Sequence, residues 1–230
     1  MYEERPARLG GGAVLWSLSG AVGATESRVL PDGCMDLIWS DGFLVAGPDT
    51  GPHVDAAAPG RSWTGLRFAP GTGPSVLGVP AHELRDRRVP LDALWPGAQV
   101  RRLTERAAES ADPAALLEQL ASPLLRPDPA HDAVRETVLR GVRQGSSVAE
   151  LAQAAGLSTR QLHRRALDAF GYGPKTLARV LRMRRALVLA RAGRPPAEVA
   201  LAAGYADQPH LAREIKALTG LPLTQLLASR

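Results

Sequence analysis

The sequence predicts an α+β chain in two domains, a small β-barrel domain with trailing helices followed by an all-α domain. The first hundred residues are rich in glycine and proline, with short apolar runs between turn signals, and helical periodicity takes over from about Val100. The charge changes as well: residues 1–127 hold 12 Lys and Arg against 15 Asp and Glu, and residues 128–230 hold 16 against 8. We therefore expect domains at 1–98 and 128–230, joined over 99–127 by a helical linker or dimerisation segment.

The bulk composition narrows the class of protein. With 45% hydrophobic residues in 230, packed cores are expected and global disorder is not. No apolar run is long enough to span a membrane, and the acidic start of the chain does not look like a secretory signal. Cys34, the single cysteine, cannot form an internal disulfide. We expect a cytoplasmic protein without membrane contact, and the basic second part indicates a polyanionic partner.

Local patterns predict the elements of the first part. Ser40-Asp41-Gly42 separates two apolar runs and is typical of a β-hairpin turn. Similar runs at 13–20 and 64–71 extend the prediction to several short strands in a small barrel. Helical periodicity over about 99–125 breaks at Asp112-Pro113, where Asp112 would cap the second helix. That region exposes three leucines that would pack either on the barrel or on a second subunit in a homodimer: Leu116, Leu117 and Leu120.

The basic part contains an internal repeat. AELAQAAGLSTRQLHRRALDAFG begins at Ala149 and AEVALAAGYADQPHLAREIKALTG at Ala197, with an offset of 48 that becomes 49 after one insertion. In each unit a short helix ends at a glycine, and a second helix begins at a capping residue, Ser158 or Asp207. Two helices joined by such a tight turn form a helix-turn-helix, whose second helix enters the DNA major groove.

The second helix of each unit has one apolar side and one arginine-bearing side. Leu162, Ala166 and Phe170 lie opposite Arg164, and the second copy repeats this polarity around Arg213. A single such face would be read equally well as solvated surface, but two matching copies favour recognition of DNA. The segment between them predicts a helix of 18 residues, from Lys175 to Ala192 and about 27 Å long. A helix of this length would hold the two recognition helices about one DNA turn, or about 34 Å, apart.

The repeat resembles the DNA-binding domain of the AraC/XylS family of bacterial transcription regulators. The resemblance covers about residues 131–228 and is carried by VAELAQAAGLSTRQLHRRALDAFGYGP, LRMRRALVLA and AEVALAAGYADQPHLAREIKALTGLP. Ala166 and Ile215 stand where the family usually has Phe, and Leu223 follows Pro222 where the family's closing proline would be. The resemblance implies a regulator that binds promoter or operator DNA, and RNA polymerase if it activates.

The family's base-reading positions fall on six residues of this chain: Arg160, His163, Arg164, Gln208, His210 and Arg213. We expect phosphate contacts from Ser158, Thr159, Lys175 and Lys216. Three arginines of the connecting helix would contact phosphate or form intramolecular ion pairs: Arg182, Arg184 and Arg185.

Residues 1–125 resemble a poorly characterised cupin-like module found in front of AraC-type domains, which implies a domain that senses a small molecule or dimerises. VLPDGCMDLIWSDGFLVAGP, GLRFAPG and VPAHELRDRRVPLDALW carry this resemblance. Asp32 and Asp36 would cap turns or face a ligand, and Cys34 would be a small core residue or a redox sensor. Five side chains would line an apolar ligand pocket or else form the core: Trp16, Cys34, Trp39, Trp63 and Phe68.

Catalytic chemistry has little support in the sequence. Cupin metals are held by clusters of His and Glu, and only His53, His82 and Glu83 are present here, without a His-x-His pair. We therefore expect no metal, no cofactor and no enzyme activity. The alternatives left open are a cupin-type enzyme with a DNA-binding tail and a protein that coats DNA without sequence preference.

Overall fold

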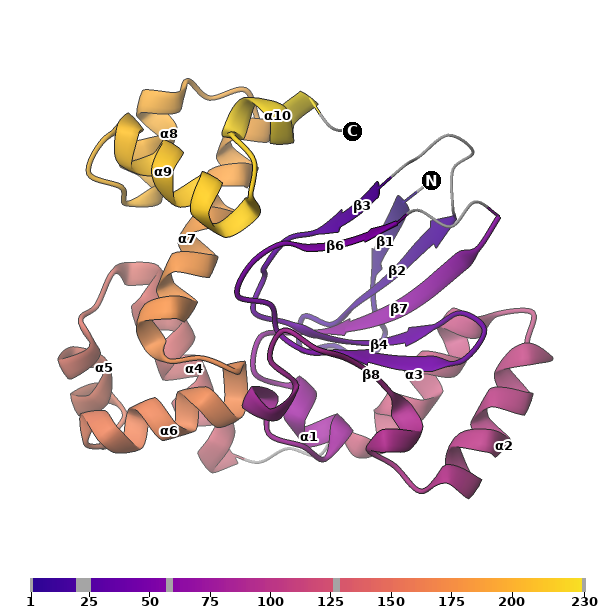
Figure 1. Cartoon of the computed structure of the whole chain (residues 1–230). Coiled ribbons are helices and arrows are strands. Elements are labelled where there is room, and N and C mark those ends of the chain that lie inside the picture. Colours follow the sequence, from indigo (N-terminus) through magenta and orange to yellow (C-terminus); the bar gives the residue numbers. More distant parts are fainter. Residues whose placement is uncertain (1, 20–25, 57–59, 126–128, 229–230) are drawn as a thin grey trace.

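The structure is a computed structural model that describes residues 2–19, 26–56, 60–125 and 129–228 (Figure 1). Its N-terminal part contains two antiparallel sheets. The larger has the order β1-β2-β7-β4-β5-β8, formed by β1 (Tyr2–Pro6), β2 (Val14–Ser19), β7 (Ser62–Phe68), β4 (Met35–Trp39), β5 (Phe43–Ala46) and β8 (Arg88–Pro90). The smaller pairs β3 (Glu26–Val29) with β6 (His53–Ala56) and lies over one face of the larger sheet in Figure 1.

The α+β class is confirmed, but the strands do not close into a barrel. Over the described ranges, β3 and β6 pair only with each other, so the two sheets remain separate. The predicted hairpin is confirmed, since Trp39 pairs with Phe43 across Ser40-Asp41-Gly42. Strand alternation gives the large sheet two different faces, one apolar and turned towards helices and one more polar.

Helices cover the apolar face of the large sheet. They are α1 (Gly73–Leu77), α2 (Gly97–Ala108) and α3 (Pro113–Ala121), with the short 3₁₀ turns η1 (Ala81–Leu84), η2 (Leu91–Ala93) and η3 (Ser122–Leu124). Asp112 caps α3 by accepting a hydrogen bond from the backbone N–H of Ala115, which confirms the predicted break. Leu116 and Leu117 are buried in the sheet core and Leu120 packs against it, so these leucines belong to the fold of the chain itself.

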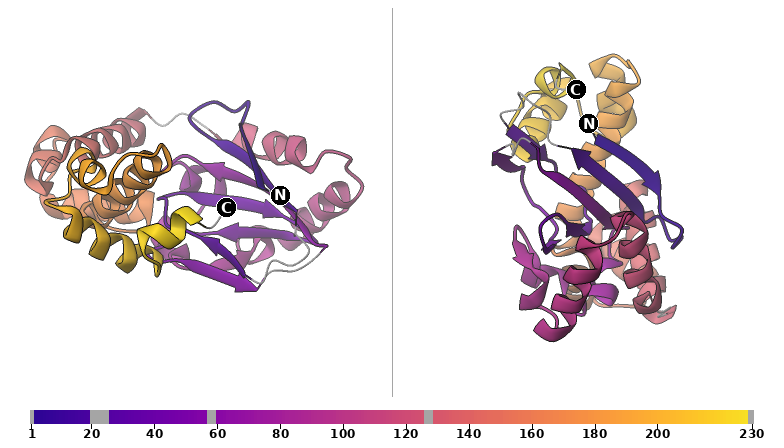
Figure 2. Two further views of the ribbon diagram at one scale, coloured as in Figure 1. Left: turned by 90° about the horizontal axis from the view of Figure 1, so that it is seen from above. Right: turned by 90° about the vertical axis from the view of Figure 1, so that its right-hand side faces the viewer.

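The C-terminal part is entirely helical. It contains α4 (Pro129–Gln144), α5 (Val148–Ala154), α6 (Thr159–Phe170), α7 (Pro174–Arg191), α8 (Pro196–Ala203), α9 (Gln208–Thr219) and α10 (Leu223–Ala228). Two apolar clusters share α7: Leu177 and Val180 pack with α4, α5 and α6, whereas Met183 and Leu187 pack with α8, α9 and α10. Figure 2 shows these helices beside one end of the sheet, with α2 and α3 towards the other end.

The expected domain limits stay predictions. The linker segment begins near α2, which starts at Gly97, and its expected end at 127 lies outside the described residues. Ala166 and Ile215, where the sequence departs from the AraC/XylS pattern, are both fully buried, at 1% and 0% exposure. Both departures therefore preserve the apolar side of their helix.

Candidate nucleic-acid interface

Local capping fixes the start of the first recognition helix, α6. The Ser158 hydroxyl accepts a hydrogen bond from the Gln161 backbone N–H (3.2 Å), and the Gln161 side chain accepts one from the Ser158 N–H (2.9 Å). This reciprocal capping box is the one predicted from the sequence. Gly156 adopts φ +65°, which lets the chain turn sharply between α5 and α6.

The second recognition helix, α9, begins in the same way one repeat later. The Asp207 carboxylate accepts a hydrogen bond from the His210 N–H (2.6 Å), and Pro209 lies in the first turn, as predicted. Gly204, at φ +81°, supplies the turn after α8. Both copies of the repeat therefore fold as helix-turn-helix units.

Both recognition helices bury the predicted side and expose the other. Leu162 and Leu211 are at 0% and 1% exposure, whereas Arg164 and Arg213 are exposed. Within the described ranges, neither arginine has an ion-pair or hydrogen-bond partner. Arg160 and Gln208 are exposed as well, near the N-terminal ends of the two helices. The two faces thus offer unpaired cations and an amide to solvent.

Residues 151–229 match a family described as a helix-turn-helix domain. The C-terminal part of the chain is an AraC-type helix-turn-helix domain. Residues 13–90 match a second family, a domain of unknown function named DUF6597. No curated protein matches the chain.

Solved structures of ToxT share the two-part fold of the chain. ToxT from Vibrio cholerae O395 has 9% identity and a TM-score of 0.50, with 99% of this chain and 97% of that chain covered. A ToxT structure bound to (E)-4-(8-methylnaphthalen-1-yl)but-3-enoic acid has 10% identity and a TM-score of 0.51, with 99% of this chain and 98% of that chain covered. The C-terminal domain of AraT, a response regulator from Geobacillus stearothermophilus, has 21% identity and a TM-score of 0.39, with 46% of this chain and 88% of that chain covered. At these identities ToxT shows the fold alone.

The two histidines expected to read bases in the AraC-type domain have contacts inside the chain. The His163 ring lies against the turn after α6, since a Cβ on Gly173 would stand 2.7 Å from its Nε2. His210 accepts a hydrogen bond from the Ala206 N–H through Nδ1 (3.3 Å), and its ring meets Tyr205 edge to face. Among the described residues the arginines and Gln208 make no such contacts, and base reading by all six residues stays a prediction.

The expected phosphate-contacting residues all lie at helix ends. The Ser158 hydroxyl and N–H are occupied by the capping box, so a phosphate there would meet the free N–H groups of Thr159 and Arg160. Lys175 is exposed in the first turn of α7, and Lys216 is exposed in the last turn of α9.

The connector arginines of the AraC-type domain divide by position. Arg182 donates to the Gly204 carbonyl (3.3 Å) and lies over the Tyr205 ring, so it has contacts within the chain. Arg185 is exposed. Arg184 is turned towards the sheet domain, where it lines a cavity.

An ion pair joins α7 to α9, and no local pattern in the sequence indicates it. Arg179 donates to Glu214 through Nε (2.8 Å) and Nη2 (3.1 Å). The hydrogen bond from Arg179 lowers the pKa of the Glu214 carboxyl. This pair ties the second recognition helix to the connector.

Replacing Glu214 by glutamine is expected to lower the unfolding free energy at pH 7 by about 0.2–1 kcal/mol, because the pair lies near the surface and is only partly buried. Because the folded-state pKa is lowered, this contribution is present above the unfolded pKa and disappears as pH falls through the folded value. Urea unfolding at pH 7 and at acidic pH measures the effect, with Glu198→Gln on α8 as the control. An equal difference in unfolding free energy between Glu214→Gln and wild type at both pH values would contradict this prediction.

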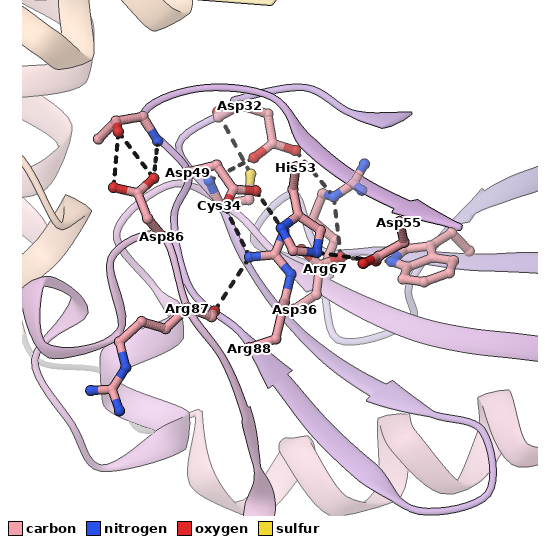
Figure 3. A network of polar contacts seen from close by, with 12 residues as sticks. Asp32, Cys34, Asp36, Asp49, His53, Asp55, Arg67, Asp86, Arg87 and Arg88 are labelled. Carbon is pink, nitrogen blue, oxygen red and sulfur yellow. Dashed lines mark hydrogen bonds and ion pairs between the residues drawn. The ribbon is translucent and has the colours of Figure 1, made fainter. Parts of the chain in front are cut away.

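A polar network lies on the other face of the large sheet (Figure 3). Arg67 Nε is 3.2 Å from Asp32 and 3.3 Å from Asp36, and its Nη1 is 3.2 Å from Glu4. Asp36 is buried and accepts a hydrogen bond from Trp16 Nε1 (2.6 Å). Burial raises the pKa of Asp36, although Arg67 opposes this effect. The network explains why Asp36 and Arg67 stand in otherwise apolar strands.

The five expected pocket residues do not gather in one place. Trp39 and Phe68 lie on the helix-facing side of the sheet, whereas Trp16 and Trp63 lie on the opposite side. Cys34 and Phe68 line a cavity of about 220 Å³ between the sheet and α7. Its walls also include Asp32, Arg67, Leu181 and Arg184.

The contacts of Cys34 and Asp32 favour structural roles. Burial raises the pKa of the Cys34 thiol, and Asp32 and Asp36 raise it further, so the thiol stays protonated and weakly nucleophilic. Asp32 accepts a hydrogen bond from the Cys34 N–H (2.9 Å) and so caps its own turn. His53 lies beside Asp55, and His82 beside Asp168. In the part of the chain that the structure describes, no three His, Cys, Asp or Glu side chains gather as metal ligands, and no helix could span a membrane.

Proposed function

We propose that this chain is a sequence-specific DNA-binding transcription regulator whose AraC-type domain reads two successive segments of the major groove. One observation carries the proposal: Arg164 and Arg213 occupy the same place in two capped recognition helices, exposed and without partners among the described residues. A solvated helix face needs no such duplication. A chain that reads two groove segments one helical turn apart does, because these segments lie on one side of the duplex.

The exposed side chains have the chemistry that base reading requires. Arginine can donate two hydrogen bonds to O6 and N7 of guanine, and glutamine can pair with adenine in the same groove. Arg160, Arg164 and Arg213 would make the first kind of contact, and Gln208 the second. Lys175, Lys216 and the N-terminus of α6 near Ser158 and Thr159 would hold phosphates, which supply much of the affinity.

We also propose that the sheet domain responds to a small molecule. The cavity of about 220 Å³ supports this, since it has walls from both the sheet and α7 and includes charged groups from each. ToxT, which shares the fold, has been solved with a small carboxylic acid bound. In this proposal the protein acts in the cytoplasm as a regulator and not as an enzyme. A homodimer and contact with RNA polymerase would follow if it activates transcription from paired sites.

Selection from a pool of random duplexes tests the DNA-binding proposal. Purified full-length protein should enrich one motif composed of two half-sites. Binding without enrichment of any sequence would indicate a protein that coats DNA, and failure to bind duplex DNA at all would overturn the proposal.

A further inference from the structure

The sheet domain contacts both recognition helices at equivalent points. In Figure 1 the C-terminal ends of α6 and α9 turn towards it. Each helix ends at a glycine with positive φ, Gly171 at +80° and Gly220 at +74°, and these glycines correspond in the sequence repeat. The sheet domain therefore contacts the same feature, the glycine that ends the recognition helix, in both copies of the repeat.

An arginine of the sheet domain binds the last carbonyls of each helix. Arg85, directly after η1, donates through Nη1 to the Gly171 carbonyl (3.3 Å). Arg28, in β3, donates through Nη1 to the Thr219 carbonyl (3.2 Å). A cation at this end of a helix is favourable, because the carbonyl dipoles leave partial negative charge there.

A single loop of the sheet domain reaches both glycines. The loop is residues 47–52, between β5 and β6. A Cβ on Gly171 would stand 2.4 Å from Pro48 Cγ, and one on Gly220 would stand 3.5 Å from Pro52 Cγ. Two prolines four residues apart thus lie against the ends of two helices that belong to different apolar clusters.

This loop is held firmly to the segment that carries Arg85. Arg88 donates two hydrogen bonds to Asp49 (2.9 and 2.7 Å), which Figure 3 shows. Asp86 accepts hydrogen bonds from the Thr50 N–H and hydroxyl and is itself at φ +57°. A non-glycine residue in this conformation is strained, and the surrounding hydrogen bonds hold it there. The loop and the arginine segment therefore act as one rigid piece.

The sheet domain leaves the base-reading surface open. Its contacts lie at the last turn of each helix and just beyond it, whereas Arg160, Arg164, Gln208 and Arg213 lie in the first two turns and are exposed. Within the helical domain, the placement of α6 relative to α9 depends on the shared helix α7. The docked sheet domain is consequently compatible with DNA reading and adds a second connection between the two readers.

We propose that Arg28 and Arg85 are positioning residues that fix the two recognition helices relative to one another, so that the sheet domain sets the spacing between the two DNA segments read by one chain. This inference rests on the proposed DNA-binding function. It assigns the sheet domain a direct part in choosing the target site.

The test measures affinity against half-site spacing. Full-length protein is titrated with the selected duplex and with versions that carry one or two extra or missing base pairs between half-sites. One base pair moves the second half-site by about 3.4 Å and turns it by about 35°. Wild type should lose about tenfold or more in affinity per inserted base pair, whereas Arg28→Ala/Arg85→Ala should lose less than about threefold.

Two further measurements keep the result unambiguous. On a duplex with a single half-site, the double variant should match wild type within about twofold, because it retains both reading faces. Arg87→Ala, on the same segment and exposed, should keep the wild-type spacing profile. An unchanged spacing profile in the double variant would overturn this inference but not the proposed function. A uniform loss of affinity on every duplex, including the single half-site, would do the same. If wild type selects no sequence at all, the proposed function itself fails.

Discussion

The double variant Arg164→Ala/Arg213→Ala is expected to lose about 2–6 kcal/mol of binding free energy on the selected site, or about 30-fold to 20,000-fold in affinity. Each bidentate arginine–guanine contact contributes about 1–3 kcal/mol of discrimination. The two residues lie on separate helices in separate apolar clusters, so their effects should add. Fluorescence anisotropy with labelled duplexes measures both the selected site and random DNA.

A charge-matched variant separates base reading from simple electrostatics. Arg140→Ala/Arg143→Ala removes two exposed arginines from α4, outside the recognition helices. This variant should lower the affinity for the selected duplex and for random duplexes by a similar, small factor. If the Arg164/Arg213 variant behaves in the same way, the two arginines neutralise charge and do not read bases.

Phe170→Ala is expected to lower the unfolding free energy of the helical domain by about 3–5 kcal/mol. Phe170 ends α6 at 1% exposure and packs in the first helix-turn-helix cluster with Leu162 and Leu177. It also reaches the sheet domain, since a Cβ on Gly71 would stand 2.7 Å from its ring. Its removal leaves a cavity where the reading helix meets its support.

Two probes can follow this loss, because all four tryptophans lie in the first hundred residues. The urea midpoint of unfolding followed by the circular dichroism of the helices should fall by more than the midpoint followed by tryptophan fluorescence. Leu201→Ala is the control: Leu201 is 82% exposed on α8, and its change should cost less than about 0.5 kcal/mol. A Phe170 effect no larger than that of Leu201 would show that the first cluster does not depend on this ring.

The elements predicted correctly from the sequence are those determined by neighbours in the chain. The Ser158–Gln161 capping box, the Asp112-Pro113 break and the turn at 40–42 each depend on a few adjacent residues. The two recognition faces followed from helical periodicity and from the repeat. These features need no knowledge of how distant segments pair.

The features that were missed depend on distant pairing. The barrel did not close because strand order, which local patterns do not determine, separates β3 and β6 from the other strands. Trp39 and Trp63 point to opposite faces because of the register between β4 and β7, so aromatic content alone could not define a pocket. Arg28 and Thr219 are 191 positions apart, and nothing local connects them. The correspondence of Gly171 and Gly220 was the one visible sign that the two helix ends are equivalent.

Methylation interference at guanine N7 on the selected duplex tests whether both recognition helices read bases, because bidentate arginine contacts use that atom. We expect two clusters of interfering guanines about one helical turn apart. Arg164→Ala should remove guanines from one cluster, in which Arg160 still reads, and Arg213→Ala should remove the other cluster. A single cluster, or two clusters that both variants leave intact, would contradict the reading of DNA by two recognition helices of one chain.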